Sequence, residues 1–172
     1  KSNSRQRAAG MVLLDTVDRP GSACVYATER ASLFFIALHR RLPYLCGSEF
    51  VSGLEKRLRL SLWLWRQGAP GWVRRQDVTA LRFRDASLDA MISLDVLEHV
   101  PDFEKALREF ARVLRPGAAL VLTIPFYEGR IDSEIVARLR EDGSIEHLGE
   151  PEFHGDPVSG GVPCFHHFAW DL

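Results

Sequence analysis

Cysteines and long apolar runs are scarce in this sequence. The 172 residues include three cysteines, Cys24, Cys46 and Cys164, which are odd in number, lie far apart and form no C-x-x-C pair. This pattern argues against a disulfide framework and a cysteine zinc site, and it favours reduced thiols in a cytoplasmic protein. No apolar run approaches the roughly 18 residues that a membrane span needs, and the N-terminus has no signal-peptide pattern. We therefore expect no transmembrane segment.

An excess of charge of one sign is also absent. Lys and Arg number 22 and Asp and Glu 23, which gives a net charge of -1. A dedicated nucleic-acid binder usually carries an excess of positive charge, so we expect no nucleic-acid partner. The charge is nevertheless uneven, because residues 54–84 hold eight basic side chains against two acidic ones.

Length and composition predict a single folded domain over residues 1–172. Hydrophobic residues make up 46% of the chain and charged residues 26%, close to the averages for soluble globular proteins. Domains commonly have about 100–150 residues, so one hydrophobic core is expected. The chain begins at Lys1 rather than Met, and we therefore expect it to be part of a longer protein.

Short apolar runs alternate with helical patterns along the first two thirds of the chain. This alternation predicts an α/β fold, with a Rossmann-like, doubly wound and mainly parallel sheet over residues 18–126. Residues 127–172 are expected to be rich in loops and to supply a lid, with residues 149–163 as one long loop. The predicted helices span 5–17, 31–42 and 101–114, and the predicted strands span 23–27, 44–50, 72–78, 88–94 and 118–126.

The segment 54–67, LEKRLRLSLWLWRQ, combines basic residues with leucines and tryptophans. Its periodicity fits both an amphipathic helix and an alternating strand, so the pattern does not decide between them. A packed connection between two strands is the favoured interpretation. A membrane surface, a subunit contact, a hydrophobic acceptor and RNA contact are alternatives, the last without support from the net charge.

Acidic side chains stand at the ends of two neighbouring predicted strands. In an open parallel α/β sheet the ligand lies beyond the carboxyl ends of the strands, where the strand order reverses. Glu49 ends the second predicted strand and is positioned to accept hydrogen bonds from ribose hydroxyls, and Asp77 lies at the end of the third, where an adenine amine is expected. Either acid alone is more typical of a helix cap or a loop, but together they favour an adenosine-containing ligand.

Residues 77–126, DVTALRFRDASLDAMISLDVLEHVPDFEKALREFARVLRPGAALVLTIPF, carry a family resemblance. The stretch resembles the central half of a class I S-adenosylmethionine-dependent methyltransferase of the group called type 11. Residues 146–157, EHLGEPEFHGDP, together with the Phe-Ala-Trp-Asp ending at 168–171, resemble a bacterial subgroup of such proteins. The resemblance implies S-adenosylmethionine as cofactor and methyl transfer as the reaction.

The resemblance also implies roles for individual residues. Glu49 would hold the ribose, Asp77 and Val78 would line the adenine pocket, and Ser93 and Leu94 would border the methionine part of the cofactor, as would Asp95. His99 would face the cofactor or substrate cavity, as a general base or as a packing residue. The residues expected to contact the acceptor are His99, Asp95, Tyr127 and His154.

The sequence departs from the family pattern at two places. The Gly-rich turn that the family has after the first strand is replaced here by Thr28, Glu29 and the residues around them, without a glycine. These side chains would crowd the methionine end of the cofactor, although Glu29 could bind its amino group. The chain also stops at Leu172, where a further helix and two more strands would follow, so the sheet is expected to be incomplete at that edge. Residues 127–172 or a partner, for instance in a homo-oligomer, would then cover it.

Histidines and acids gather near the C-terminus without a recognised metal-binding spacing. His147, His154, His166 and His167 lie among Glu146, Glu152 and Asp156, but no H-E-x-x-H or zinc-finger pattern is present. We therefore predict no metal site, and expect the turn at 154–157 to act as a lid over the acceptor.

Three functions remain in order of support. The first is methyl transfer from S-adenosylmethionine to a small-molecule or glycan-like acceptor. The second is a non-catalytic methyltransferase-like module that acts in protein association, which the missing glycines favour. The third, a nucleotide-binding oxidoreductase domain, is disfavoured because the sequence has no Gly-x-Gly-x-x-Gly turn.

Overall fold

The computed structural model describes residues 3–19, 21–155 and 161–172. Their contacts divide the chain into two compact units, one of residues 1–94 and 107–123 and the other of residues 95–106 and 124–172. These bounds differ from the predicted division at residue 126, and a single domain stays a prediction. Among the described residues, no helix is long and apolar enough to cross a membrane.

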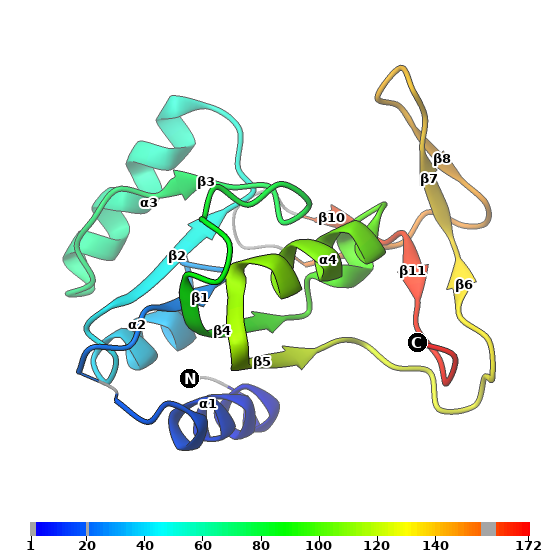
Figure 1. Ribbon diagram of the computed structural model, residues 1–172. Helices are drawn as coiled ribbons and strands as arrows, with labels where there is room; N and C mark the ends of the chain where they lie inside the picture. The colour runs from blue at the N-terminus through cyan, green and yellow to red at the C-terminus, as the bar shows by residue number, and fades with distance from the viewer. Residues whose placement is uncertain (1–2, 20, 156–160) are drawn as a thin grey trace. The chain divides into compact units, whose positions relative to one another are not determined.

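The first unit is built on a five-stranded parallel sheet (Figure 1). The strand order is β3-β2-β1-β4-β5, and every neighbouring pair is parallel. The predicted α/β fold with a mainly parallel sheet is confirmed. The elements in chain order are α1 (Ser4–Thr16), β1 (Val25–Ala27), α2 (Leu33–His39), β2 (Leu45–Glu49), α3 (Leu54–Arg66), β3 (Arg74–Arg75), β4 (Leu88–Leu94), α4 (Phe103–Val113, whose first residues fall in the second unit) and β5 (Leu114–Thr123).

Local sequence explains where the first two helices begin. Asn3 caps α1, because its side chain accepts a hydrogen bond from the Gln6 backbone while the Gln6 side chain accepts one from the Asn3 backbone. Ser32 caps α2 by accepting a 3.0 Å hydrogen bond from the Phe35 amide. The predicted start at residue 31 is therefore two residues too early.

Two predicted strands differ from the observed ones by more than two residues at one end or both. The prediction of a strand over 72–78 was too long, since only Arg74 and Arg75 pair with β2. The strand predicted over 118–126 is β5, which begins earlier, at Leu114, because Leu114 already pairs with Leu88. An irregularity follows in this pairing, and Gly117 adopts a positive φ of 81° there.

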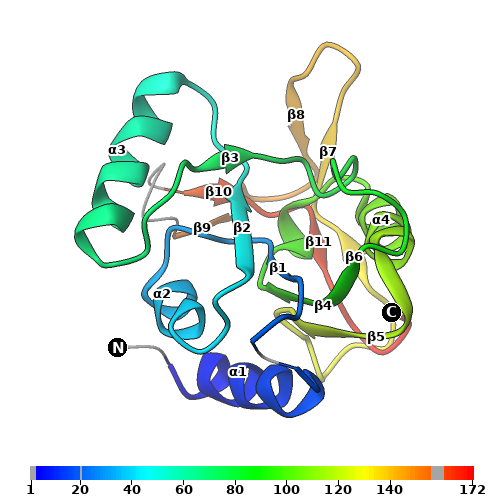
Figure 2. The ribbon, with the colours of Figure 1, turned by 60° about the vertical axis from the view of Figure 1, so that its left-hand side comes forward.

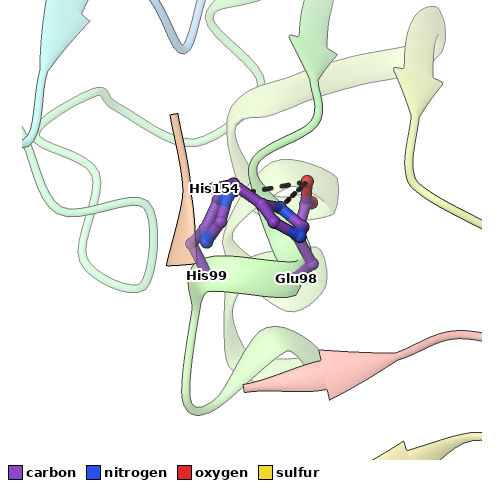
Figure 3. Close-up of side chains that lie close together, drawn as sticks. All are labelled: Glu98, His99 and His154. Carbon is purple, nitrogen blue, oxygen red and sulfur yellow. Dashed lines mark ion pairs between the residues drawn. The ribbon is translucent and has the colours of Figure 1, made fainter. Parts of the chain in front are cut away.

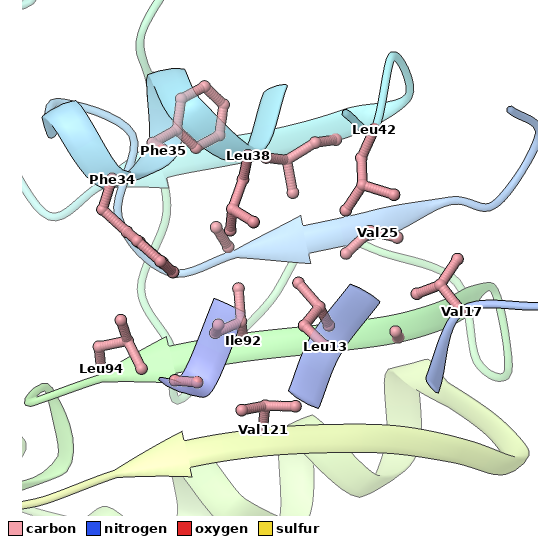
Figure 4. Close-up of a cluster of buried hydrophobic side chains, with 14 of the residues drawn as sticks. Leu13, Val17, Val25, Phe34, Phe35, Leu38, Leu42, Ile92, Leu94 and Val121 are labelled. Carbon is pink, nitrogen blue, oxygen red and sulfur yellow. The ribbon is translucent and has the colours of Figure 1, made fainter. Parts of the chain in front are cut away.

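The hydrophobic core lies between α1, α2 and one face of the sheet (Figure 4). Strand side chains alternate between faces, so Val25 on β1 and Ile92 on β4 project to the same side. They meet Leu13 of α1 and Phe35 of α2, and all four are at most 1% exposed. The α1 helix and the α2 helix thus cover the same face of the sheet.

Tyr26 follows Val25 on β1, so its side chain lies on the opposite face of the sheet. The Tyr26 ring packs edge-on against Phe83 at a centroid distance of 4.8 Å. Arg112 of α4 donates hydrogen bonds to the carbonyls of Leu81 and Phe83, so it ties this segment to the helix. Helices or loops therefore cover both faces, as the doubly wound prediction requires.

The ambiguous segment 54–67 is a helix, α3, beside β3 (Figure 2). Ser61 fixes it there, because its hydroxyl accepts a 3.0 Å hydrogen bond from the Val73 amide and donates to the Arg57 carbonyl. Leu64 is fully buried, which supports the predicted packed connection on one side of the helix. The other side exposes a stripe of large apolar side chains, Leu54, Leu58, Leu62 and Trp65.

The second unit contains one 3₁₀ helix and several short strand pairs. The helix η1 (Leu97–His99) binds the C-terminal segment through a 2.7 Å hydrogen bond from the Phe165 amide to the Glu98 carbonyl. The strands are β6 (Glu134–Ile135), β7 (Ala137–Leu139), β8 (Ile145–His147), β9 (Phe153–His154), β10 (Val162–Pro163) and β11 (His166–His167). The antiparallel pair of β9 and β10 lies inside residues 149–163, so the prediction of one long loop was wrong for its described ends.

Protonation of His166 is expected to destabilise the second unit. Its ring packs between Phe103 and Phe168, and its Nε2 donates to the carbonyls of Val100 and Pro101 at 3.1 Å. Burial lowers the pKa of His166 below its usual 6.5. His166 therefore takes up its proton at a higher pH in the unfolded chain than in the folded one. The free energy of unfolding is thus highest above about pH 6.5 and decreases as the pH falls below that value.

We expect the thermal unfolding midpoint to drop more between about pH 7.5 and 5.5 in the native protein than in a His166→Gln variant, since glutamine does not titrate there. Circular dichroism melts measure this difference. Equal drops in both proteins would exclude His166 as the group responsible.

Candidate functional site

The strand order reverses between β1 and β4, where the sequence placed the methionine end of the cofactor. Thr28 follows β1, and its hydroxyl donates a 3.1 Å hydrogen bond to the hydroxyl of Ser93 near the end of β4. Both side chains are buried. The Thr28 backbone amide also bonds to the Ile92 carbonyl. Two small hydroxyl side chains thus close the space between these strands, and Leu94 next to Ser93 is also buried.

Glu49 ends β2 and organises the loop between β1 and α2. Its Oε1 accepts hydrogen bonds from the backbone amides of Arg30 at 2.7 Å and Ala31 at 2.6 Å. Two amide donors stabilise the charged form of a carboxylate. The acid at the end of the second strand is thus a carboxylate fixed against the loop that replaces the usual glycine-rich turn.

Asp77 and Val78 follow β3 and are half-buried. Asp77 Oδ1 accepts hydrogen bonds from the Thr79 amide at 2.9 Å and the Thr79 hydroxyl at 2.7 Å. One carboxylate oxygen therefore stabilises its own turn, as the loop interpretation of this acid predicts. Glu49 ends β2 and Asp77 follows β3, the strand next to it, so the two acids lie at the same edge of the sheet.

The remaining predicted site residues lie in the second unit. Asp95 directly follows β4 and adopts a left-handed φ of 53°, a conformation that short polar side chains tolerate best. The Tyr127 ring packs against His167 at a centroid distance of 4.5 Å. Burial, and then the charge of Glu152, raise the pKa of the Tyr127 hydroxyl. At neutral pH that hydroxyl is therefore protonated, so it can donate a hydrogen bond but does not act as a base.

His99 and His154 come together, although 55 positions separate them in the sequence. Their rings pack edge-on with centroids 4.9 Å apart. His99 lies on η1, and its Nδ1 is 2.9 Å from the Pro163 carbonyl oxygen. Of the predicted turn at 154–157, His154 and Gly155 are described, whereas Asp156 and Pro157 lie outside the described residues.

A hollow of about 440 Å³ lies beside β3 in the first unit. Among the described residues, no acidic side chain lines it and no carboxylate pairs with its arginines. Arginines of residues 54–84, the segment with an excess of basic side chains, thus gather at this hollow. Its lining consists of Arg57, Arg74, Arg75, Gln76, Arg82 and Phe83.

The sequence did not indicate the contacts of three residues that shape these sites. Arg30 is buried, donates to the Pro70 carbonyl and lies over the Phe35 ring. Glu98 is buried beside His99, and Glu152 accepts hydrogen bonds from two histidines. The D-V-L-E-H motif contained Glu98, but the contacts of Arg30 and Glu152 come from distant segments and left no local signal.

Comparison with known proteins identifies relatives of the central part of the chain. A family model described as "Methyltransferase domain" matches residues 50–122. Methyltransferase GfsG of Streptomyces halstedii is 32% identical over 78 residues, which are 42% of this chain and 28% of that protein. The 27-O-demethylrifamycin SV methyltransferase of Amycolatopsis mediterranei is 46% identical over 46 residues, 27% of this chain and 17% of that protein. The chain thus spans less than a third of the length of these relatives.

A solved structure supports the same fold. The YcgJ protein of Bacillus subtilis superposes with a TM-score of 0.57 at 20% identity, over 72% of this chain and 52% of that chain. An identity this low bears on the fold alone. The family match includes Asp77, Ser93 and Leu94 and begins one residue after Glu49. The family match and the parallel strand order thus identify a class I S-adenosylmethionine-dependent methyltransferase domain of the group called type 11, matched over residues 50–122 of the chain.

Proposed function

We propose that this protein transfers a methyl group from S-adenosylmethionine to a small-molecule or glycan-like acceptor. The observation that carries the proposal is the Glu49 carboxylate, held at the end of β2 by two loop amides in a sheet of the methyltransferase strand order. A relative named for 27-O-demethylrifamycin SV supports a small-molecule acceptor.

The residues at the strand ends would bind and orient the cofactor. Glu49 would accept hydrogen bonds from the ribose hydroxyls while it fixes the loop, and Asp77 with Val78 would bind the adenine. When bound, S-adenosylmethionine supplies an activated methyl group on a sulfonium, which an acceptor nucleophile displaces in line. Positioning provides most of the rate enhancement in such a reaction, so no protein nucleophile is required. Thr28, Glu29, Ser93 and Leu94 would surround the methionine part.

Acceptor contact is proposed for residues of the second unit. Tyr127 would donate a hydrogen bond to the acceptor, since its hydroxyl is protonated at neutral pH. Asp95 would accept one, and His99 would contact the acceptor or pack near it. His154 would contribute from β9.

A cytoplasmic location and a homo-oligomeric assembly are proposed from two further features. Cys24, Cys46 and Cys164 form no disulfide, which supports a cytoplasmic protein. Among the described residues, no strand pairs with the outer edge of β5. A homo-oligomer is one way of covering that edge, and its test is the mass of the particle in light scattering.

Titration calorimetry with S-adenosylhomocysteine tests the proposed function. We expect micromolar binding to the native chain, and binding about tenfold or more weaker after Glu49→Gln or Asp77→Asn, because each change removes a charge that hydrogen-bonds the nucleoside. Glu55→Gln is the matched control, since this exposed acid of α3 pairs only with Arg59 and should leave the affinity unchanged.

The same titration separates the two function classes. Circular dichroism first establishes that each variant is folded. A folded chain that gives no heat of binding would contradict the enzyme proposal and favour the non-catalytic module. Binding that none of the substitutions changes would place the cofactor elsewhere.

A further inference from the structure

Three side chains of the second unit converge on one point (Figure 3). Glu98 and His99 belong to η1, and His154 belongs to β9. Glu98 Oε1 lies 3.7 Å from His99 Nε2 and 3.9 Å from His154 Nδ1. Each of the three residues offers one ligand atom within 4.8 Å of those of the other two.

Hydrogen bonds on the far side of each ring assign the nitrogen lone pairs. His99 Nδ1 is 2.9 Å from the Pro163 carbonyl oxygen, which only accepts, so Nδ1 carries the proton. His154 Nε2 is 2.9 Å from Glu152 Oε1, and the carboxylate likewise requires a proton on Nε2. In neutral rings, His99 Nε2 and His154 Nδ1 are therefore the lone-pair nitrogens, and both face Glu98.

The distances between these ligand atoms suit a shared metal ion. The Glu98 side chain is only 1% exposed, so a cation bound to its carboxylate would be largely shielded from solvent. Separations of 3.7 and 3.9 Å are too long for hydrogen bonds. They match the roughly 3.4–4.2 Å between ligand atoms that each lie about 2.1 Å from one metal ion.

The outer contacts of the histidines also resemble those of metal ligands. A metal-bound histidine usually donates its second N–H to a carbonyl or a carboxylate, which orients the ring. Pro163 does this for His99, and Glu152 does it for His154. Glu152 also accepts a 2.6 Å hydrogen bond from His167.

We propose that Glu98, His99 and His154 bind a divalent transition-metal ion of the zinc class. Two imidazole nitrogens and one carboxylate favour Zn²⁺ over Mg²⁺, which prefers oxygen ligands. Three protein ligands leave a fourth position for water or another oxygen donor. The C-terminal histidines alone have no metal-binding spacing, and Glu98 and His99, which complete the cluster, lie more than 50 positions before His154 in the sequence.

Titration of Zn²⁺ into metal-free, tag-free protein tests this site. We expect one site of micromolar or tighter affinity, weakened more than about 100-fold by His99→Ala or His154→Ala, and about 10- to 100-fold by Glu152→Gln, which removes only an outer contact. Mg²⁺ should not compete. His147→Ala is the matched control, because this histidine lies on β8 outside the cluster.

A second variant separates the site from its neighbour. Glu152, Cys164 and His167 also lie close enough together to hold an ion. Cys164→Ala should leave Zn²⁺ affinity unchanged, and the Co²⁺-loaded protein should show no thiolate charge-transfer band. No Zn²⁺ binding by folded protein, an affinity that His99→Ala and His154→Ala leave intact, or loss on Cys164→Ala would each overturn the proposal. The readout is metal binding, so it does not depend on methyl transfer.

Discussion

Replacing Phe35 with alanine is expected to lower the free energy of unfolding of the first unit by about 3–5 kcal/mol. The Phe35 ring is fully buried in the core between α2 and the sheet. It stacks on His39 at a centroid distance of 5.8 Å, and the Arg30 guanidinium lies 5.2 Å from its centre. Truncation therefore removes buried apolar area, leaves a cavity and takes away the surface on which Arg30 rests.

Urea unfolding followed by circular dichroism measures this loss. Leu33→Ala is the control on the same helix, because Leu33 is 53% exposed and its truncation creates no cavity. We expect that control to change the stability by less than about 1 kcal/mol. A Phe35→Ala loss as small as the control's would show that the core is not closed around this ring.

The sequence predicted the elements whose signals are local. The apolar residues of α4 recur at three and four positions, and β2 and β4 lie in short, mostly apolar stretches with an acid or a serine near their carboxyl ends. The carboxyl ends of parallel strands share one edge of the sheet, so the neighbouring placement of Glu49 and Asp77 could also be predicted. What the pattern could not show is that each acid already accepts hydrogen bonds from its own surroundings.

The parts that could not be predicted depend on contacts between distant segments. The periodicity of 54–67 fitted two structures, and the observed helix is held beside β3 by a hydrogen bond between Ser61 and Val73 that the periodicity does not reveal. The strands of the second unit that have two or three residues are too short to show a period of two. Glu98 on η1 and His154 on β9 are far apart in the sequence and meet only in the folded chain. No short sequence motif therefore marks their cluster.

Gly47→Ala is expected to destabilise the first unit by about 1–3 kcal/mol and to weaken S-adenosylhomocysteine binding. A β-carbon at Gly47 would lie 2.7 Å from Phe35 Cε2 and 2.9 Å from the Glu29 carbonyl oxygen. The ring can shift, but the backbone carbonyl belongs to the loop whose next two amides bind Glu49. Overpacking in the core thus displaces the donors that orient the proposed ribose-binding carboxylate.

Combining this change with Phe35→Leu tests the cause. The smaller side chain vacates the position of Cε2, so Gly47→Ala should cost less stability in the Phe35→Leu background than in the native protein. The contact with the Glu29 carbonyl persists in both, so the loss of S-adenosylhomocysteine affinity should not be rescued. Gly21→Ala is the control, because a β-carbon there meets nothing within 4 Å. Equal stability costs in both backgrounds would exclude the Phe35 contact as the source of the strain, and full recovery of binding would mean that the ring, not the loop carbonyl, controls Glu49.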